Sequence, residues 1–159
     1  MGIKNIVVSI NEEPSSIITV KYSIYIAKKM NAKLIGIYVV NEEVIRELLK
    51  TNIFIPDEAR KYEEEIGKQE EAFLKRVKKM AESKGVDFES YVLKGVVHTE
   101  VIKKCKEVNG ELLIIGELKK YISIKDIFYD EGEKIIREAK CPVVVVRNEN
   151  IVNELYNSI

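Results

Sequence analysis

The chain has few of the residue types on which metal and redox sites depend. Among its 159 residues there is no tryptophan, one histidine (His98) and two cysteines (Cys105 and Cys141). A single histidine excludes a multi-histidine metal site within one chain. The cysteines lie in apolar segments without a C-x-x-C spacing, so we interpret them as buried structural thiols. No metal site and no catalytic residue is predicted.

The chain also lacks an excess of charge of either sign and a long apolar run. Its 26 lysines and arginines balance 26 aspartates and glutamates, so there is no overall basic field to attract nucleic acid. No apolar run approaches the ~18–20 residues that a membrane span needs, and the first apolar segment is too short for a signal peptide. We therefore expect a cytoplasmic protein without a nucleic-acid or membrane partner.

What the chain does contain is an alternation of apolar runs and helical patterns. Short apolar runs typical of buried strands are Lys4–Ile10, Lys33–Val40, Asp87–Leu93, Leu112–Ile115 and Pro142–Val146. Helical patterns lie between them, at residues 16–31, 42–50, 57–84, 100–108 and 130–139. The charged residues of the 57–84 helix are interpreted as a solvated face.

This alternation predicts an α/β fold. Runs that are apolar on both faces belong in a parallel sheet covered by helices on both sides. We predict a single Rossmann- or flavodoxin-like domain over residues 1–147, with an open five-stranded parallel sheet in the order 3-2-1-4-5. Residues 148–159 form a polar tail with apolar residues at roughly helical spacing. The tail either docks on the body or on a partner chain, or it frays.

The topology also predicts where a ligand would bind. In open α/β sheets ligands bind beyond the carboxyl ends of the strands, at the switch point of strand order. Residues that follow the predicted strands would line this crevice. They are Ile10, Asn11 and Glu12, then Val39, Val40 and Asn41, then Gly116 and the residues after it.

Several of these segments carry a resemblance to the universal stress protein family. The first strand ends at Asn11 and the second at Val40, Gly95 follows the third strand, and Gly116 follows the fourth. The last helix leads into Cys141-Pro142-Val143, as in that family. The chain resembles the family over nearly all its length, which implies the same fold and a homodimer formed through the strand Pro142–Val146.

The chain departs from the family at the phosphate-binding motif, G-x2-G-x9-G-[S/T]. Gly116 occupies the first glycine position, but Lys119 replaces the second glycine, Tyr129 the third, and Asp130 the serine or threonine. Asn11 stands where ATP-binding members have aspartate. In those members the glycines let backbone N–H groups approach the phosphates, and a tyrosine adds bulk where close approach is required.

Two interpretations of this loop stay open. In the first, Asp130 caps its own helix and occupies the positive helix end that a phosphate would use. In the second, Lys119, Lys120 and Lys125 replace the backbone donors as phosphate ligands. Elsewhere, Ser15 and Ser16 are interpreted as helix caps. His98 is interpreted as part of a helix entrance and not as a general base.

These residues favour a universal-stress-type regulatory or interaction protein, homodimeric and with an unidentified protein partner, that does not bind ATP tightly. An ATP-binding, slowly hydrolysing switch that uses Gly116 and the loop lysines is the alternative. An enzyme of the adenine-nucleotide α-hydrolase-like group is a further one, but the residues after the first strand lack its glycine-rich loop. No cofactor is required, and ATP and AMP both stay open as ligands.

Overall fold

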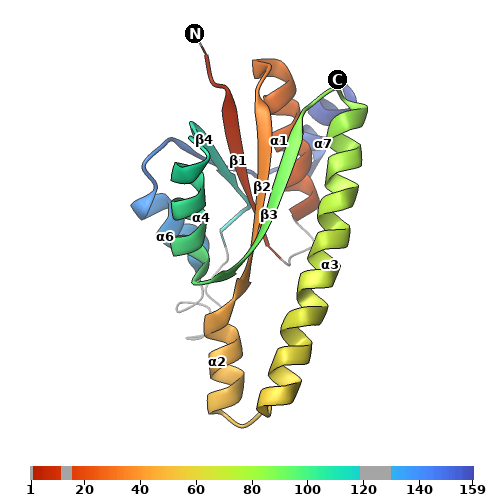
Figure 1. The fold of residues 1–159 in the computed structure, drawn as a ribbon. Coiled ribbons are helices and arrows are strands. Elements are labelled where there is room, and N and C mark those ends of the chain that lie inside the picture. The colour runs from red at the N-terminus through yellow and green to blue at the C-terminus, as the bar shows by residue number, and fades with distance from the viewer. Residues whose placement is uncertain (1, 12–15, 119–129) are drawn as a thin grey trace.

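An open parallel sheet forms the centre of the protein in the computed structural model, which describes residues 2–11, 16–118 and 130–159. The sheet has five strands in the order β3-β2-β1-β4-β5 (Figure 1). They are β1 (Asn5–Ile10), β2 (Lys33–Asn41), β3 (Phe88–Gly95), β4 (Leu112–Ile115) and β5 (Val143–Val145). The predicted fold class, strand number and strand order are confirmed.

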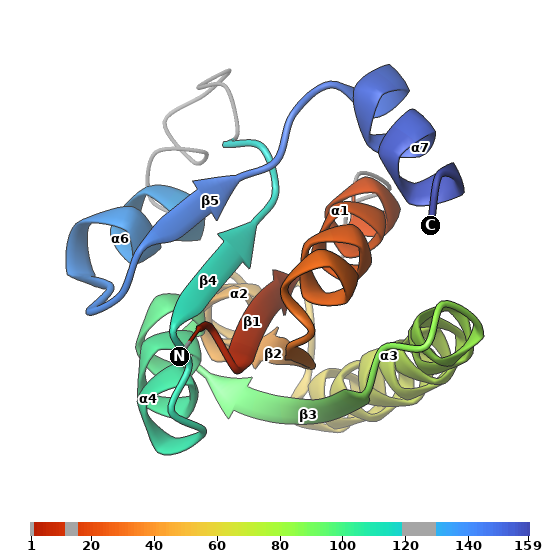
Figure 2. The ribbon, with the colours of Figure 1, turned by 90° about the horizontal axis from the view of Figure 1, so that it is seen from above.

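Helices cover both faces of this sheet. The first face carries α1 (Ser16–Met30), α3 (Pro56–Ser83) and α7 (Glu149–Asn157), and the second carries α4 (Val97–Glu107) and α6 (Glu131–Glu138) (Figure 2). The short helix α2 (Glu42–Lys50) lies beyond the strand ends, beside the first half of α3 (Figure 1). We call α2 and the first half of α3, residues 42–69, the arm.

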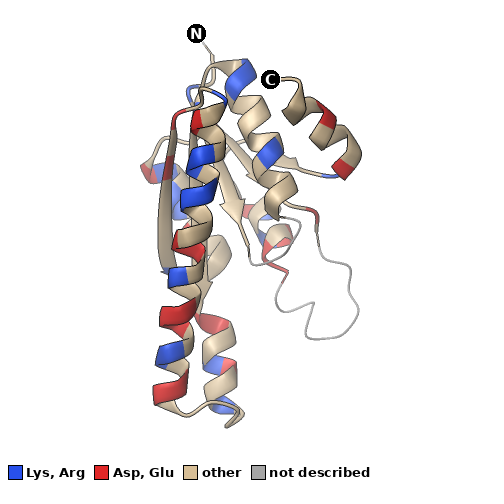
Figure 3. Ribbon diagram, turned by 90° about the vertical axis from the view of Figure 1, so that its right-hand side faces the viewer, with Lys and Arg blue, Asp and Glu red and all other residues tan. Residues whose placement is uncertain are grey.

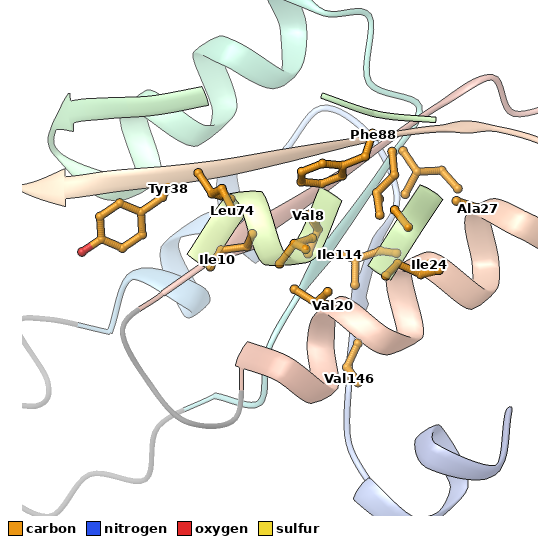
Figure 4. Packing of buried hydrophobic residues seen from close by; sticks show 14 of the residues in the cluster. Val8, Ile10, Val20, Ile24, Ala27, Tyr38, Leu74, Phe88, Ile114 and Val146 are labelled. Atoms are coloured by element: carbon orange, nitrogen blue, oxygen red, sulfur yellow. The ribbon is translucent and has the colours of Figure 1, made fainter. Parts of the chain in front are cut away.

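The strands point alternate side chains into two cores. In β1, Ile6 and Val8 face α1 and α3, whereas Val7 faces α4, and all three side chains are fully buried. The first of these cores contains Val20 and Ile24 of α1 (Figure 4). This alternation follows from the two-residue repeat of a strand. A strand that is apolar on both faces can therefore sit only between two layers of helices.

Helix α3 is anchored through its second half. Leu74, Val77 and Ala81 are buried there against the sheet, and lysines and arginines alternate with acidic residues along the outer face (Figure 3). The arm is tied to the sheet by Lys94 of β3, whose Nζ lies 2.9 Å from Glu63 Oε2. The interpretation of this charge run as a solvated face agrees with its exposure.

Most boundaries lie within two residues of those predicted, and the start of α4 differs by three. Helix α4 begins at Val97, three residues before the predicted start at Glu100, because Gly95 takes a φ of +149° and redirects the chain as β3 ends. The buried residues of α3 include Ala59 and Ala81 beside Leu74 and Val77. Hydrophobicity alone does not identify a small residue such as Ala81 as part of a core.

The tail after residue 147 forms helix α7 and packs on the body of the same chain. Val152 is buried against the first core, and the Lys21 ammonium of α1 lies 3.0 Å from Asn153 Oδ1. Lys84 Nζ lies 4.7 Å from the centre of the Tyr156 ring. These contacts fix α7 beside α1 (Figure 2).

Alanine substitutions at two glycines test this packing, because one should lower and the other should raise the free energy of unfolding. An alanine Cβ at Gly36 of β2 would lie 2.8 Å from the Phe88 ring, whereas nothing lies within 4 Å of a Cβ at Gly67 of α3. We expect Gly36→Ala to lower the free energy of unfolding by about 1–3 kcal/mol through overpacking. Gly67→Ala should raise it by about 0.5–1 kcal/mol through helix propensity. Urea unfolding of both variants measures the difference, and a neutral Gly36→Ala would contradict the described packing.

Candidate ligand-binding crevice

A cavity of about 390 Å³ opens at the carboxyl ends of the central strands. Its floor is made by the last residues of three neighbouring strands and the residues that follow them, which are Ser9, Ile10, Asn11, Val39, Val40, Asn41, Ile115 and Gly116. Strand β1 connects toward β2 on one side and pairs with β4 on the other, so the cavity lies at the switch point of strand order. Its size is within the range of small-molecule sites.

The walls of this crevice come from segments that are distant in sequence. On one side the arm supplies Val44, Ile45, Tyr62 and Ile66, and on the other α6 and its N-cap supply Asp130, Gly132 and Ile135. The sequence analysis did not include the arm in the site. Its lining residues belong to an ordinary amphipathic pattern, and only the folding back of α2 and α3 over the strand ends brings them there.

Asn11 at the end of β1 is held in place by the first residue of α1. The Ser16 hydroxyl accepts a hydrogen bond from the Asn11 N–H at 3.2 Å and lies 2.7 Å from both Asn11 O and Asn11 Oδ1. Ser16 is buried, so this contact fixes the route of the chain out of the sheet. The sequence analysis interpreted Ser16 as a helix cap, and this contact gives it a role at the crevice floor.

At the end of β2, Val39 and Val40 are buried in the two opposite cores and both reach the cavity. The next residue, Asn41, caps α2, because its Oδ1 accepts a hydrogen bond from the Glu43 N–H at 3.0 Å. The strand therefore turns directly into the arm. The base of the crevice and its arm wall are one continuous piece of chain.

Two further predicted site residues, Gly116 and Asp130, also line the crevice. Gly116 follows β4, where a Cβ would lie 3.0 Å from Thr19 Oγ1. Asp130 is buried and caps α6 as predicted, with its Oδ1 accepting from the Glu133 N–H at 3.3 Å. Lys119 and Tyr129 lie outside the described residues. The structure thus brings Asn11, Val39, Val40, Gly116 and Asp130 to one cavity.

Glu131, the first residue of α6, joins this helix to α4. Glu131 Oε2 accepts a hydrogen bond from the His98 N–H and lies 2.6 Å from His98 Nδ1. Glu131 Oε1 lies 3.3 Å from Lys134 Nζ. Burial by itself would raise the pKa of Glu131, but the two His98 contacts and the Lys134 charge outweigh it and leave this pKa below its usual range. Glu131 is therefore ionised at neutral pH.

The charge of the described lining is negative. Glu117, Asp130 and Glu131 line the cavity, and none of the lining residues described is a lysine, arginine or histidine. His98 lies just outside it, with Nδ1 against Glu131 and Nε2 3.4 Å from Glu138 Oε2. Carboxylates near a helix N-terminus complement its dipole and compete with a bound phosphate for the same partial charge.

The described lining beside the α6 N-terminus is acidic, and the first turn of this helix is capped by the chain itself. Three acidic residues, Glu117, Asp130 and Glu131, are among the residues that line the cavity, and the Glu133 N–H is already bonded to Asp130. Within residues 2–11, 16–118 and 130–159, no group of three histidine, cysteine or acidic side chains is placed to hold a metal ion. Within the same ranges, no helix is long and apolar enough to cross a membrane.

The fold is that of a flavodoxin-like α/β protein, with a cavity at the switch point between β1 and β4. The sequence model of the universal stress protein family matches residues 2–147. The chain therefore belongs to the universal stress protein family.

Individual relatives agree with this assignment. The chain is 30% identical over 156 residues to a universal stress protein of Methanocaldococcus jannaschii, covering 91% of this chain and 82% of the relative. A universal stress protein in complex with cAMP has the same fold, with a TM-score of 0.65 at 21% identity, over 92% of this chain and 98% of the other. One from Archaeoglobus fulgidus in complex with dAMP has a TM-score of 0.57 at 15% identity, over 92% and 100%.

The Glu131–His98 contact predicts a pH-dependent contribution to stability. Because the pKa of Glu131 is depressed in the folded state, its contribution is complete above the ordinary value of 4.5 and is lost as pH falls through the lower folded value. Glu131→Gln should lower the free energy of unfolding by about 1–3 kcal/mol at neutral pH. The difference from the unaltered protein should shrink at a pH of about 3.5.

Urea unfolding at both pH values measures this effect. Glu138→Gln is the matched control, because it removes an equal charge from the same helix at an exposed side chain whose contact with His98, at 3.4 Å, is longer than that of Glu131. The control should change stability by less than about 0.5 kcal/mol. An equal loss in the two variants, or a Glu131→Gln deficit that does not depend on pH, would contradict the assigned role.

Proposed function

We propose that this protein is a regulatory binding protein whose crevice takes an adenosine mononucleotide in preference to ATP. The observation that carries the proposal is the acidic lining beside the α6 N-terminus, formed by Glu117, Asp130 and Glu131. Repulsion from these carboxylates grows with the number of phosphate charges on the ligand. Two relatives with the same fold are in complex with cAMP and dAMP, which supports a monophosphate as the ligand class.

The apolar part of the crevice supports a flat base as the other end of this ligand. Ile10, Val39, Val40 and Ile115 lie at the strand ends, and Tyr62 of the arm lines the same cavity. Apolar and aromatic side chains with a few polar groups are typical of such sites. Asn11 and Asn41 supply amide groups at this floor, where they would hydrogen-bond a nucleobase or a ribose.

The lining supports binding and regulation over catalysis. The only histidine, His98, is not a lining residue and is engaged by Glu131 and Glu138. A nucleophile or water at the crevice would therefore lack a histidine base within reach. In the alternative, an ATP-binding switch, Gly116 and the lysines Lys119, Lys120 and Lys125 would bind the phosphates. These three lysines lie outside the described residues.

Calorimetric titration of the protein, stripped of bound ligand, tests the proposed preference. We expect cAMP and AMP to bind and ATP with magnesium to bind at least about tenfold more weakly, because its phosphates carry more charge toward the three carboxylates. ATP binding tighter than AMP binding would overturn the proposal and favour the ATP switch. No detectable binding of any of the three nucleotides would also overturn the proposal.

A charge-neutralising variant tests the physical cause. Asp130→Asn keeps an oxygen that can cap α6 but removes a charge, so it should raise ATP affinity by about three- to tenfold and AMP affinity by less. The matched control is Glu138→Gln, which removes the same charge from α6 at a side chain that does not line the cavity. Equal gains in the two variants would indicate a general charge effect and contradict a local one.

We further propose that two copies of this chain pair through the edge strand β5. Among the described strands, β5 pairs with β4 alone. Pro142 O and Val146 N–H both bond to β4, and alternate residues of a parallel ladder face the same neighbour. The N–H groups of Val143 and Val145 therefore point toward the open edge. An apolar edge of this kind requires covering, and a second β5 is a suitable partner.

Two substitutions at one position separate edge pairing from packing. Val145→Pro removes an outward N–H without touching the β4 ladder, so it should shift the protein from dimer to monomer in analytical ultracentrifugation. Val145→Thr keeps this backbone N–H and has a side chain of similar shape, so this variant should remain dimeric. A monomeric unaltered protein, or a dimer that survives Val145→Pro unchanged, would contradict pairing through β5.

A further inference from the structure

The two cysteines of the chain meet at the far side of the second core. Cys105 lies on the last turns of α4, and Cys141 lies between α6 and β5. Their Sγ atoms are 4.0 Å apart although 36 residues separate them in sequence. Both cysteines were predicted to be buried structural thiols, whereas Cys141 is only partly buried and lies in contact with Cys105.

The surroundings keep the two sulfur atoms close. Gly110 packs directly on Cys105, since a Cβ there would lie 2.5 Å from Cys105 Sγ and 2.8 Å from Val7 Cγ2. The Gly110 N–H also bonds to Cys105 O at 2.7 Å. On the other side, Leu113 N–H bonds to Pro142 O at 3.0 Å and fixes the chain next to Cys141.

The two thiols differ in their access to solvent. Cys105 is buried and Cys141 is partly exposed. Burial, together with the neighbouring Cys141, raises the pKa of the Cys105 thiol to about 12. Cys105 is therefore a protonated thiol at neutral pH, and an oxidant in solution reaches Cys141 first.

We propose that Cys105 and Cys141 form a peroxide-responsive site that closes into an intramolecular disulfide. A disulfide bond is about 2.05 Å long, so each sulfur must move by about 1 Å from the observed contact. Rotation of the partly exposed Cys141 side chain supplies part of this movement. The two thiols lie near the amino ends of β4 and β5, at the end of the sheet opposite the crevice, so the proposed disulfide does not rest on the proposed ligand.

The reaction balances with one molecule of hydrogen peroxide. The Cys141 thiolate attacks one peroxide oxygen, the O–O bond breaks, and the departing hydroxide takes a proton to become water, which leaves a sulfenic acid. The Cys105 sulfur then attacks the Cys141 sulfur. The S–O bond breaks, and the Cys105 proton leaves with the hydroxide as a second water. Two thiols and one peroxide thus become one disulfide and two waters.

The Cys105–Cys141 disulfide would close a loop that includes elements lining the crevice. The segment that it closes runs from Cys105 to Cys141 and contains β4, Gly116 and α6. Such a closed loop restricts the unfolded chain. For a loop of this length we expect the thermal midpoint to rise by about 5–10 °C on oxidation. The reduced protein should recover its original midpoint after dithiothreitol.

Mass spectrometry of the full chain tests the proposal. After treatment with hydrogen peroxide, unfolding and alkylation, we expect a monomer that is lighter by two hydrogens and carries no alkyl group. A peptide that links Cys105 to Cys141 should appear after proteolysis. Full alkylation of both thiols, a disulfide-linked dimer, or sulfinic acid as the main product would each overturn the proposal.

Single substitutions test the order of the two steps. Cys105→Ser should leave a sulfenic acid on Cys141, which dimedone traps, whereas Cys141→Ser should leave Cys105 unreacted until the protein is unfolded. Dimedone labelling of Cys105 in the folded Cys141→Ser variant would contradict the assigned order. If either variant fails to fold, the mass and the linked peptide of the unaltered protein still decide the proposal.

Discussion

Burial of the central strands on both faces is the constraint on which the rest of the structure depends. β1 and β2 carry apolar side chains on both sides, so helices must cover the two faces. Right-handed connections then place β2 and β4 on opposite sides of β1. The connections that follow β1 and β4 therefore leave the sheet toward opposite faces at the carboxyl ends of these strands. The crevice is the space between these connections.

The character of this crevice depends on competition for one helix end. The N-terminus of α6 carries a partial positive charge that a ligand phosphate or a protein carboxylate can use. Here Asp130 caps the helix and Glu131 binds His98 of the neighbouring α4. The same carboxylates stabilise the wall and give it a negative charge. Under the proposed function, stability of the fold and selectivity against highly charged ligands would have a common source.

Much of the fold, but less of the site, was predictable from the sequence. Apolar runs such as Leu112–Ile115 identify the strands through local hydrophobicity, and the alternation with helices limits their order in the sheet. The crevice floor at Asn11, Val39, Val40 and Gly116 follows from topology. Contacts between distant segments leave no local pattern. The arm wall, the Glu131–His98 contact and the Cys105–Cys141 pair therefore appear only in three dimensions. Lys119 and Tyr129 lie outside the described residues and stay predictions.

The arm has a consequence for local opening of the structure. Most side chains of the arm are exposed or partly exposed, with Ile45 and Ala59 buried, whereas the second half of α3 is buried against the sheet at Leu74, Val77 and Ala81. Amide hydrogens along this one helix should therefore exchange with solvent at graded rates, fastest in the arm. Because Tyr62 and Ile66 line the cavity, a ligand that fills it would slow exchange in the arm. Occupancy of the crevice would thus be transmitted to a surface far from the sheet.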